Sequence, residues 1–565
     1  MTNPLLTPEE LQAEIDRCWP LAQGHWSKFL LLGAPIDDSK QPSVAQIHLG
    51  TRQVSLNFES LCKHQLKGSI EAILAHEVGH HVKYPGSMAV QARMRMLERS
   101  LLPFENFSLI NLFTDIMINE RLGHELRDQL MAVYVVFTHE EAFHGEKAWK
   151  QDPSFLFYMA IYEEMWRLKP GVLMGPARGE FEENFPSYRS DAQIVAAKLF
   201  MMGPNIYTQF LYFISVVCHY IKPIDHDAPQ RTCPYECGAG QPTPEDWADA
   251  LNPSAKEKEA VERAVAEGWF PADQGDRLLD LFDIEDRIAS LPGTGTDDAH
   301  LIPEIMAAWY RQQAETYLFR PPPQRRLGEA VVPTTHEDWE AGDPLRDIDW
   351  LETFRLRGEL YGTGSPLKRS QIAEHEGQET VVWQPRLEIY LDVSGSMPDP
   401  RRAMNSMTLA AQILTMGTIR AGGWIRALIY SNDPVLYWEW CRSEVDISQF
   451  LMHYVGGGTQ FPFLVLSKSV AECQNDQPIR VVISDTDFDR NYDANARAPA
   501  MFAQAVDNSP HFILLQHRPD DQRVKLYRSL GATVVEVEQM QDFPRMAADL
   551  TFALFPTGDH GTVPT

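Results

Sequence analysis

Two histidines and a glutamate are spaced so that they could hold a metal ion and use it. The sequence His76-Glu77-Val-Gly-His80 lies in a segment whose apolar residues recur at helical spacing. On a helix, His76 and His80 fall one turn apart on the same face, so both imidazoles can reach one ion. Zinc suits the pair because it accepts imidazole nitrogen and can keep one coordination position open. Glu77 would then be the catalytic base, taking a proton from a water at the metal.

A third zinc ligand is expected from the next predicted helix, over residues 107–122. There Asn111, Asp115 and Asn119 form a polar ridge at intervals of four on an otherwise apolar element. Buried polar groups need partners, so this ridge indicates a site. We expect Asp115 to be the third ligand, with Asn111 and Asn119 orienting it or a histidine. Glu120 is the alternative third ligand, and a helix with surface polar residues is the remaining interpretation.

A second set of possible metal ligands consists of hard oxygen atoms at the ends of predicted strands. A D-x-S-x-S sequence directly follows a predicted strand over residues 387–391. A Gly-Gly-Gly-Thr sequence opens a later predicted helix, and an aspartate follows the predicted strand over residues 480–484. Carboxylate and hydroxyl oxygens on tight turns suit Mg²⁺. The expected magnesium ligands are Asp392, Ser394, Ser396, Thr459 and Asp485, with Asp487 as a nearby substitute for Asp485.

Two other groups of metal-ligating residue types have less suitable spacing. His139 and His144 are five positions apart, unlike the histidines of H-E-x-x-H, and we expect them on the surface. Cys233 and Cys237, with His226 nearby, have no second cysteine pair to complete a zinc knuckle. A loop with free thiols is therefore expected there.

The elements of the amino-terminal half must bring the zinc ligands together. We expect a helix over residues 7–31, strands over 45–49 and 52–57, and mainly helices over 125–222. A strand pair followed by an H-E-x-x-H helix is the order found in zincin folds. In those folds an edge strand borders the cleft and can pair with an extended peptide.

In the carboxy-terminal half, short apolar runs alternate with helical stretches. This alternation predicts a doubly wound, mostly parallel sheet whose ligands bind at the carboxyl ends of the strands. Strands are expected over 387–391, 425–430, 480–484, 512–516 and 533–537, with helices over 401–420 and 460–473 between them. The whole chain is thus expected to be multidomain: a mainly α, zincin-like domain over 1–225, a helical connector over 226–320, a preceding segment over 321–386, an α/β domain over 387–556 and a tail over 557–565.

Both sets of ligands resemble known families. H-E-V-G-H and N-x-x-x-D-x-x-I-N-x-x-L resemble the metallopeptidase region that precedes a VWA-like domain in a bacterial protein family, over roughly residues 45–125. Members of that family usually carry Asp at the position matching Asp115, and not always Glu at the position matching Glu120. The five magnesium positions resemble the metal-ion-dependent adhesion site of VWA domains. That resemblance implies an ion with a free coordination position, which a partner's Asp or Glu can fill.

A third motif lies between the connector and the α/β domain. The sequence from Gly342 to Trp350 is similar to the G-D-x-x-R-x-I-D-W signature that precedes the VWA domain in proteins encoded beside MoxR-type AAA+ ATPases. The similarity implies such an ATPase as partner.

Composition restricts the class of function. With 565 residues the chain is too long for one core, and its net charge of −28 argues against binding to nucleic acid or to anionic membranes. No apolar stretch is long enough to predict a transmembrane helix. The first residues do not resemble a secretory signal, and seven scattered cysteines do not suggest disulfides. We therefore expect a cytoplasmic protein.

Two functions remain open at this point. The first is a zinc-dependent peptidase whose magnesium-binding VWA domain docks a protein partner, a MoxR-type ATPase that delivers substrate or gates the cleft. The second is a non-proteolytic adaptor or assembly factor, in which zinc is structural and the magnesium site recruits clients to the ATPase. Glu77 favours the enzyme, because a purely structural zinc site does not need that carboxylate.

Overall fold

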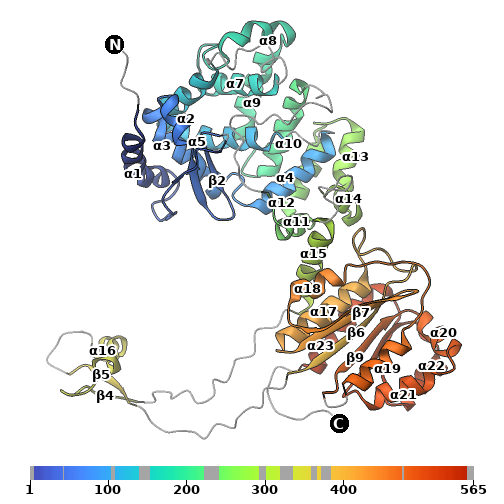
Figure 1. Ribbon diagram of the computed structural model, residues 1–565. Helices are drawn as coiled ribbons and strands as arrows, with labels where there is room; N and C mark the ends of the chain where they lie inside the picture. The colour runs from blue at the N-terminus through green and yellow to red at the C-terminus, as the bar shows by residue number, and fades with distance from the viewer. Residues whose placement is uncertain are drawn as a thin grey trace.

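The computed structural model describes residues 6–41, 43–102, 108–138, 153–221, 241–291, 301–318, 335–357, 365–370, 384–473 and 476–555. Helices dominate the amino-terminal half, and a six-stranded sheet forms the centre of the carboxy-terminal half (Figure 1). Within these ranges no helix combines the length and hydropathy needed to cross a membrane. The histidines predicted on the surface at 139 and 144, and the loop around Cys233 and Cys237, lie outside the described residues.

The amino-terminal half is organised around two helices that carry the predicted zinc ligands. Helix α3 (Ile70–Val82) packs against α1 (Pro8–Gly24) on one side and α5 (Ile110–Thr138) on the other. Helix α1 begins with a capping box in which the side chains of Thr7 and Glu10 each accept a backbone N–H of the other. It ends earlier than the predicted boundary, whereas α5 extends well beyond the predicted one.

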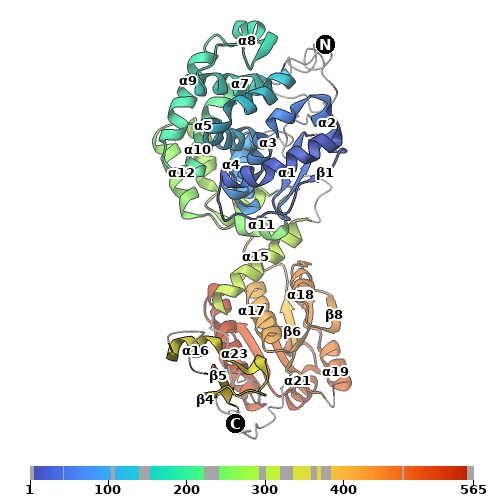
Figure 2. The same cartoon turned by 90° about the vertical axis from the view of Figure 1, so that its left-hand side faces the viewer.

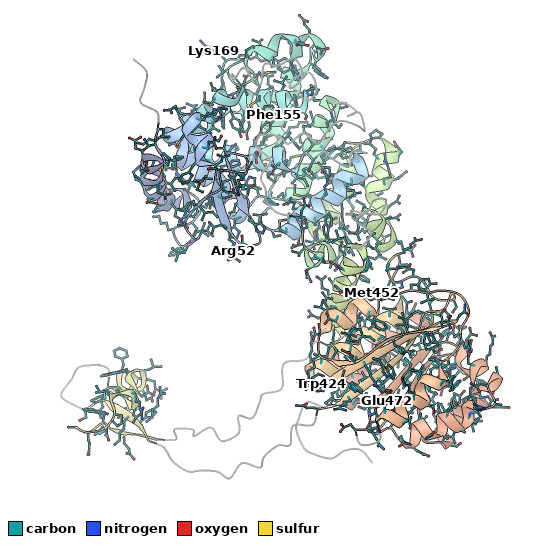
Figure 3. All side chains as sticks on the ribbon, in the orientation of Figure 1. Arg52, Phe155, Lys169, Trp424, Met452 and Glu472 are labelled. Carbon is teal, nitrogen blue, oxygen red and sulfur yellow. The ribbon has the colours of Figure 1, made fainter. Side chains whose placement is uncertain are left out.

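A small sheet lies beside α3. Strands β2 (Ala45–His48) and β3 (Gln53–Leu56) form the predicted antiparallel pair, with Arg52 at their turn in a left-handed conformation (φ 60°; Figure 3). The prediction of a strand pair is incomplete, because β1 (Ile36–Asp37) adds a third strand parallel to β3. Both residues of β1 are exposed, so no apolar alternation marks it in the sequence. Strand β2 occupies an edge of this sheet and contacts α3.

Helices α3 and α5 approach each other closely at Gly79. A Cβ atom on Gly79 would lie 2.5 Å from Cζ2 of Trp26 and 2.9 Å from Cγ2 of Ile118. Both distances are far below the contact distance of carbon atoms, which is about 3.5–4.0 Å. Trp26 is itself held in place, since its Nε1 donates to the carbonyl oxygen of Ala75 at 2.7 Å. The glycine inside the H-E-x-x-H sequence therefore lets α3 lie directly against α5.

The other helices of this half extend the same apolar core. Phe113 of α5, for example, packs against Phe210 and Phe213. Residues 255–280 also pack on this core, because α12 contacts α10 and α13 contacts α4. The helices concerned are α2 (Phe58–Lys63), α4 (Met88–Leu101), α7 (Pro153–Met165), α8 (Arg178–Asn184), α9 (Tyr188–Lys198), α10 (Ile206–Val217), α12 (Ala255–Ala266) and α13 (Ala272–Asp280).

The carboxy-terminal sheet has the strand order β11-β10-β9-β6-β7-β8. All neighbours are parallel except β8, which runs antiparallel to β7. The five predicted strands are present within about a residue at each end, and β8 is an additional strand. Val435 and Leu436 of β8 are 39% and 46% exposed, so this edge strand lacks the continuous apolar run of a buried one. The strands are β6 (Arg386–Asp392), β7 (Trp424–Tyr430), β8 (Pro434–Cys441), β9 (Ile479–Ser484), β10 (Phe512–His517) and β11 (Thr533–Val537).

Helices cover both faces of this sheet, and each face has its own apolar cluster (Figure 1). The predicted helix over 401–420 begins only at residue 406, where the side chain of Asn405 accepts the first backbone N–H groups. One face carries α17 (Ser406–Arg420), α18 (Glu444–Phe450) and α23 (Phe543–Leu554). The other carries α19 (Phe463–Glu472), α20 (Asp487–Ala494), α21 (Ala498–Asp507) and α22 (Asp521–Ser529).

Helix α15 (Leu301–Tyr317) joins the two halves. It contacts α17 of the α/β unit and α11 (Pro244–Ala250), which in turn contacts α4 (Figure 2). The hydroxyl of the buried Tyr310 accepts from the backbone N–H of Asn405 at 2.7 Å and donates to the carbonyl of Ala403 at 3.3 Å. On the other side, Arg93 of α4 pairs with Asp249 of α11 at 2.7 Å.

Residues 335–357 and 365–370 form a small unit of their own. Strands β4 (Thr335–Asp338) and β5 (Leu367–Ser370) pair antiparallel beside α16 (Trp350–Arg357). Two aspartates of the G-D-x-x-R-x-I-D-W sequence hold it together: Asp343 pairs with Lys368 at 2.8 Å, and Asp349 with Arg369 at 2.9 Å. Helix α16 leaves large apolar side chains exposed, among them Leu351 and Phe354.

Replacing Gly79 by alanine tests the contact between α3 and α5. We expect Gly79→Ala to lower the free energy of unfolding by about 1–3 kcal/mol, because the new methyl group cannot fit between Trp26 and Ile118. Urea denaturation measures this loss. Gly24→Ala is the matched control, since a Cβ there meets nothing within 4 Å. Equal stability of the Gly79→Ala and Gly24→Ala variants would contradict the role assigned to Gly79.

Candidate metal centres

The packing of α3 against α5 brings His76, His80 and Asp115 together. Nε2 of His76 lies 3.2 Å from Nε2 of His80, and Oδ1 of Asp115 lies 3.4 Å and 3.2 Å from these two nitrogens. Around a tetrahedral zinc with bonds of about 2.0–2.1 Å, ligand atoms lie about 3.3–3.4 Å apart. The separations therefore fit three corners of a zinc tetrahedron. Among the described residues, no other group of three His, Cys, Asp or Glu side chains meets in this way.

The second nitrogen of each histidine is held by a group that fixes the ring. Nδ1 of His76 lies 2.8 Å from the side-chain oxygen of Asn119, and Nδ1 of His80 lies 2.9 Å from the carbonyl oxygen of Tyr84. Both partners are acceptors, so each Nδ1 carries the hydrogen, and in the neutral imidazole each Nε2 can offer its lone pair to a metal. Asn119 therefore lies where it could orient His76, and its orienting role stays a prediction. Asn111 lies one turn before Asp115 and is half-buried.

One carboxylate oxygen of Asp115 faces only the two histidines. Its Oδ1 is buried and makes no hydrogen bond to any described residue. Burial alone would raise the pKa of this carboxyl, but the facing histidines lower it to about 2. Burial would likewise lower the pKa of His76, yet the charge of Asp115 raises it to about 9. Both pKa shifts result from the attraction between the Asp115 carboxylate and the imidazoles. A buried negative charge in this place suits a bound cation.

The alternative third ligand, Glu120, lies elsewhere on the helix. Its carboxylate is 3.8 Å from Nε2 of His124, and both side chains face solvent, with 35% and 79% of their surfaces exposed. Residue 120 comes one position after Asn119, so its side chain is turned by about 100° around the helix axis from the ridge of Asp115 and Asn119. The Glu120 side chain therefore does not face α3 as Asp115 does. The geometry favours Asp115 over Glu120.

Glu77 lies in a pocket of about 520 Å³, including its open mouth, that also contains His76 and Asp115. The Glu77 side chain is 4% exposed and accepts a hydrogen bond from the backbone of Ile47 in β2. Burial raises the pKa of this carboxyl. A raised pKa brings a glutamate closer to the range of an effective general base. The rest of the pocket is largely apolar, formed by Val44, Ala45, Ile73, Leu130 and Val133, with Ser43, Asn119 and Tyr134.

Three tyrosines next to this pocket were not predicted from the sequence. Tyr134 of α5 and Tyr158 and Tyr162 of α7 are buried, and their hydroxyl groups lie within hydrogen-bonding distance of one another. Burial raises the pKa of all three phenols, so they stay protonated. The sequence does contain a pattern that could have indicated two of them. Tyr158 and Tyr162 are four positions apart, the same spacing as that of the polar residues on α5.

The predicted magnesium ligands lie at the carboxyl edge of the large sheet. Asp392 ends β6 and Asp485 follows β9, its neighbour. From β6 the chain passes to β7 and β8 on one side, then returns to β9, β10 and β11 on the other. The two aspartates therefore lie at the point where the strand order reverses, which is where open α/β sheets bind ligands.

Hydrogen bonds connect these oxygen atoms. The hydroxyls of Ser394 and Ser396 are 3.0 Å apart, and Ser396 donates to Asp485 at 3.0 Å. Thr459 donates to Asp487 at 3.2 Å rather than to Asp485. All of these groups are oxygen donors, and Ser396 is exposed while Asp392 is fully buried. A hard cation such as Mg²⁺ fits this set, and its outer side would face solvent.

Asp392 is buried and forms no ion pair with a Lys, Arg or His side chain in the part of the chain that the structure describes. Its carboxylate accepts from the backbone N–H of Ser394 at 3.0 Å and from the hydroxyl of Ser484 at 2.9 Å. Burial, reinforced by the charge of Asp485, raises the pKa of this carboxyl to about 6. The loop that carries Thr459 passes close to the Asp392 turn, since the N–H of Gly395 donates to the carbonyl of Gly457 at 2.9 Å. A Cβ on Gly395 would lie 3.1 Å from that oxygen, so glycine suits the position.

Comparison with known proteins gives a limited result. No protein-family model matches the chain, and no curated protein sequence matches it. Among solved structures, a von Willebrand factor type A from Catenulispora acidiphila is similar at 14% identity, with a TM-score of 0.23. The match covers 30% of this chain and 42% of that chain. The six-stranded, mostly parallel sheet with helices on both faces is compatible with a VWA-like α/β domain.

Zinc content separates the two candidate third ligands. We expect Asp115→Ala to lose stoichiometric zinc and Glu120→Ala to keep it, because only Asp115 faces the two histidines. Mass spectrometry of metals on protein dialysed against limited zinc measures this. Zinc retained by Asp115→Ala and lost from Glu120→Ala would reverse the assignment.

Thermal stability tests the magnesium site and its dependence on pH. Because the folded state raises the pKa of Asp392, the metal-free fold loses stability as pH rises from about 4 to about 6, where the buried carboxylate becomes charged. Mg²⁺ binds the charged form of Asp392, so the stabilisation by Mg²⁺ is complete above about pH 6 and decreases below that pH. At a hundredfold excess over its Kd, we expect Mg²⁺ to raise Tm by about 5 °C at pH 7.5.

Two variants complete that measurement. Asp392→Ala should show no shift in Tm with Mg²⁺ at either pH, whereas Asp507→Ala, at an exposed aspartate of the same domain, should respond like wild type. A Mg²⁺ effect of the same size at pH 5 and pH 7.5 would contradict binding through Asp392.

Proposed function

We propose that this chain is a cytoplasmic zinc-dependent peptidase whose VWA domain recruits a protein partner through magnesium. The observation that supports this most directly is the meeting of three possible zinc-ligand atoms, from His76, His80 and Asp115, beside a pocket that His76, Asp115 and the buried Glu77 line. A zincin-like arrangement of strand β2 and helix α3 is part of the proposal.

Zinc bound by His76, His80 and Asp115 would supply Lewis acidity, which lowers the pKa of water and polarises a peptide carbonyl. The chain's own contribution to the reaction comes from Glu77. It lies next to His76 in the sequence and lines the same pocket, so it can take a proton from the attacking water and later pass it to the leaving amine. The raised pKa of its carboxyl suits both steps.

The substrate fits as an extended peptide along β2. This strand has β3 on one side only, so its other edge can pair with a peptide backbone, and Ser43, Val44 and Ala45 at its start line the pocket. The apolar side chains of Ile73, Leu130 and Val133 then favour an apolar residue of the substrate beside the metal.

The VWA domain would select the partner. An ion held by Asp392 and the neighbouring oxygens lies where Ser396 is exposed, so an Asp or Glu of another protein can reach it. The proposed partner is a MoxR-type AAA+ ATPase, supported by the similarity of residues 342–350 to the signature described above. The exposed apolar side chains of α16 are available for such a contact.

Conservative replacement of Glu77 tests the peptidase. With equal zinc in both proteins, we expect Glu77→Gln to cut unfolded protein clients at least about 100-fold more slowly than wild type, since a general base contributes about 10²–10⁴. Cleavage is followed with and without the ATPase by electrophoresis and mass spectrometry. Glu120→Gln serves as the control and should retain full cleavage.

The same experiment can favour the adaptor instead. No cleavage by zinc-loaded wild type in either condition, together with loss of client recruitment to the ATPase in Asp392→Ala, would contradict the peptidase. Zinc would then be structural, and the magnesium site would carry the function.

A further inference from the structure

We infer that Tyr134, Tyr158 and Tyr162 are positioning residues of the zinc site, which fix the ligands and leave Asp115 with a single oxygen for the metal. This inference rests on the proposed zinc site, although it does not depend on proteolysis. It assigns a role to α7, a helix that carries none of the metal ligands. Figure 3 shows Phe155, near the start of α7, within the amino-terminal half.

The three hydroxyl groups form a triangle in which each lies within hydrogen-bonding distance of the other two. Tyr158 lies 3.0 Å from Tyr134 and 3.0 Å from Tyr162, and Tyr134 lies 3.3 Å from Tyr162. All three side chains are almost completely buried. Polar groups are costly to bury unless they are hydrogen-bonded, so packing alone does not account for three phenols at this place. Phenylalanine would fill the same volume without that requirement.

The cluster first fixes the orientation of Asn119. The amide nitrogen of Asn119 donates to Tyr134 at 2.8 Å and to Tyr162 at 2.7 Å, which uses both of its hydrogens. Its oxygen must therefore point the other way, toward Nδ1 of His76 at 2.8 Å. A flipped amide would put N–H groups against His76 and leave both phenols without their donor. His76 is thereby held with Nε2 facing the metal position.

The cluster also acts on Asp115, through its second oxygen. The hydroxyl of Tyr158 donates to Oδ2 of Asp115 at 3.3 Å, whereas Oδ1, the oxygen that faces both histidines, has no hydrogen-bond donor among the described residues. Each phenol has one hydrogen to give. The hydroxyl of Tyr158 donates to Asp115 and that of Tyr134 donates to Tyr162, which leaves the Tyr162 hydroxyl able to donate to Tyr158.

The consequence is a carboxylate with two different oxygens. Oδ2 is occupied by a phenol, and Oδ1 is left for the cation, so Asp115 should bind zinc through one oxygen atom only. Zinc then keeps a coordination position for water, as catalytic sites require. Both ligand contacts on the α5 side, Asn119 to His76 and Asp115 to zinc, therefore depend on phenols that α7 supplies.

Replacing Tyr158 by phenylalanine tests this inference without measuring activity. We expect Tyr158→Phe to weaken zinc binding about 10- to 100-fold, measured by competition with a chelator. Removing a residue that hydrogen-bonds to a metal ligand typically lowers metal affinity by about that factor. Tyr188→Phe is the matched control. Its hydroxyl is also in a buried residue of this half but contacts Arg178, so zinc affinity should be unchanged.

A spectroscopic measurement separates positioning from general loss of packing. In cobalt-substituted protein, release of Oδ2 in Tyr158→Phe should let Asp115 bind through both oxygens, which raises the coordination number and weakens the visible absorption bands. Tyr162→Phe leaves the contact from Tyr158 to Asp115 intact, so it should weaken zinc binding while the bands keep their wild-type intensity. If Tyr158→Phe does not fold, the zinc affinity of Tyr162→Phe tests the inference instead. Weaker binding than wild type would support it, and wild-type affinity would contradict it.

Failure of this inference and failure of the peptidase give different results. Wild-type zinc affinity in both Tyr158→Phe and Tyr162→Phe, with an unchanged cobalt spectrum in Tyr158→Phe, would overturn the positioning role even if wild type cuts peptides. Weakened zinc binding and altered bands in Tyr158→Phe would support it even if wild type cuts nothing.

Discussion

The direct contact between α3 and α5 at Gly79 is the constraint on which the amino-terminal half depends. His76 and His80 belong to one helix and Asp115 to the other, so the ligand atoms meet at 3.2–3.4 Å only if the helix axes lie close together. A side chain at residue 79 would push them apart. The same closeness buries Asp115 beside two histidines, where its Oδ1 finds no hydrogen bond. This packing favours a positive charge beside Asp115, which zinc would supply, while Asn119 and the tyrosines hydrogen-bond the other polar atoms of His76 and Asp115.

The second proposed metal site arises from a different constraint, the reversal of strand order in a parallel sheet. The carboxyl ends of β6 and β9 lie side by side there; Asp392 is the last residue of β6, and Asp485 directly follows β9. Helix α15 connects the two halves, because Tyr310 bonds to residues 403 and 405 of the α/β unit while α15 also contacts α11, which packs on α4.

Local patterns predicted a good part of this structure. The apolar runs that mark β6, β7, β9 and β10 are buried on both faces, so the sequence identifies these strands nearly to the residue. The edge strand β11 is partly exposed, but its apolar residues still marked its position. The ridge on α5 likewise singled out Asp115 and Asn119, because a polar stripe on an apolar helix needs partners. What could not be predicted depends on contacts between distant segments. Strand β1 is defined only by its pairing with β3, and Tyr158 meets Asp115 across 43 positions of sequence.

The central claim is that α3 and α5 hold zinc through His76, His80 and Asp115. Anomalous diffraction at the zinc absorption edge, on crystals of the zinc-loaded chain, tests it most directly. We expect one strong peak per chain, at about 2.0–2.1 Å from Nε2 of both histidines and from one oxygen of Asp115, with Oδ2 still bonded to Tyr158. A zinc peak coordinated by Glu120, or no peak between the two histidines, would contradict the account.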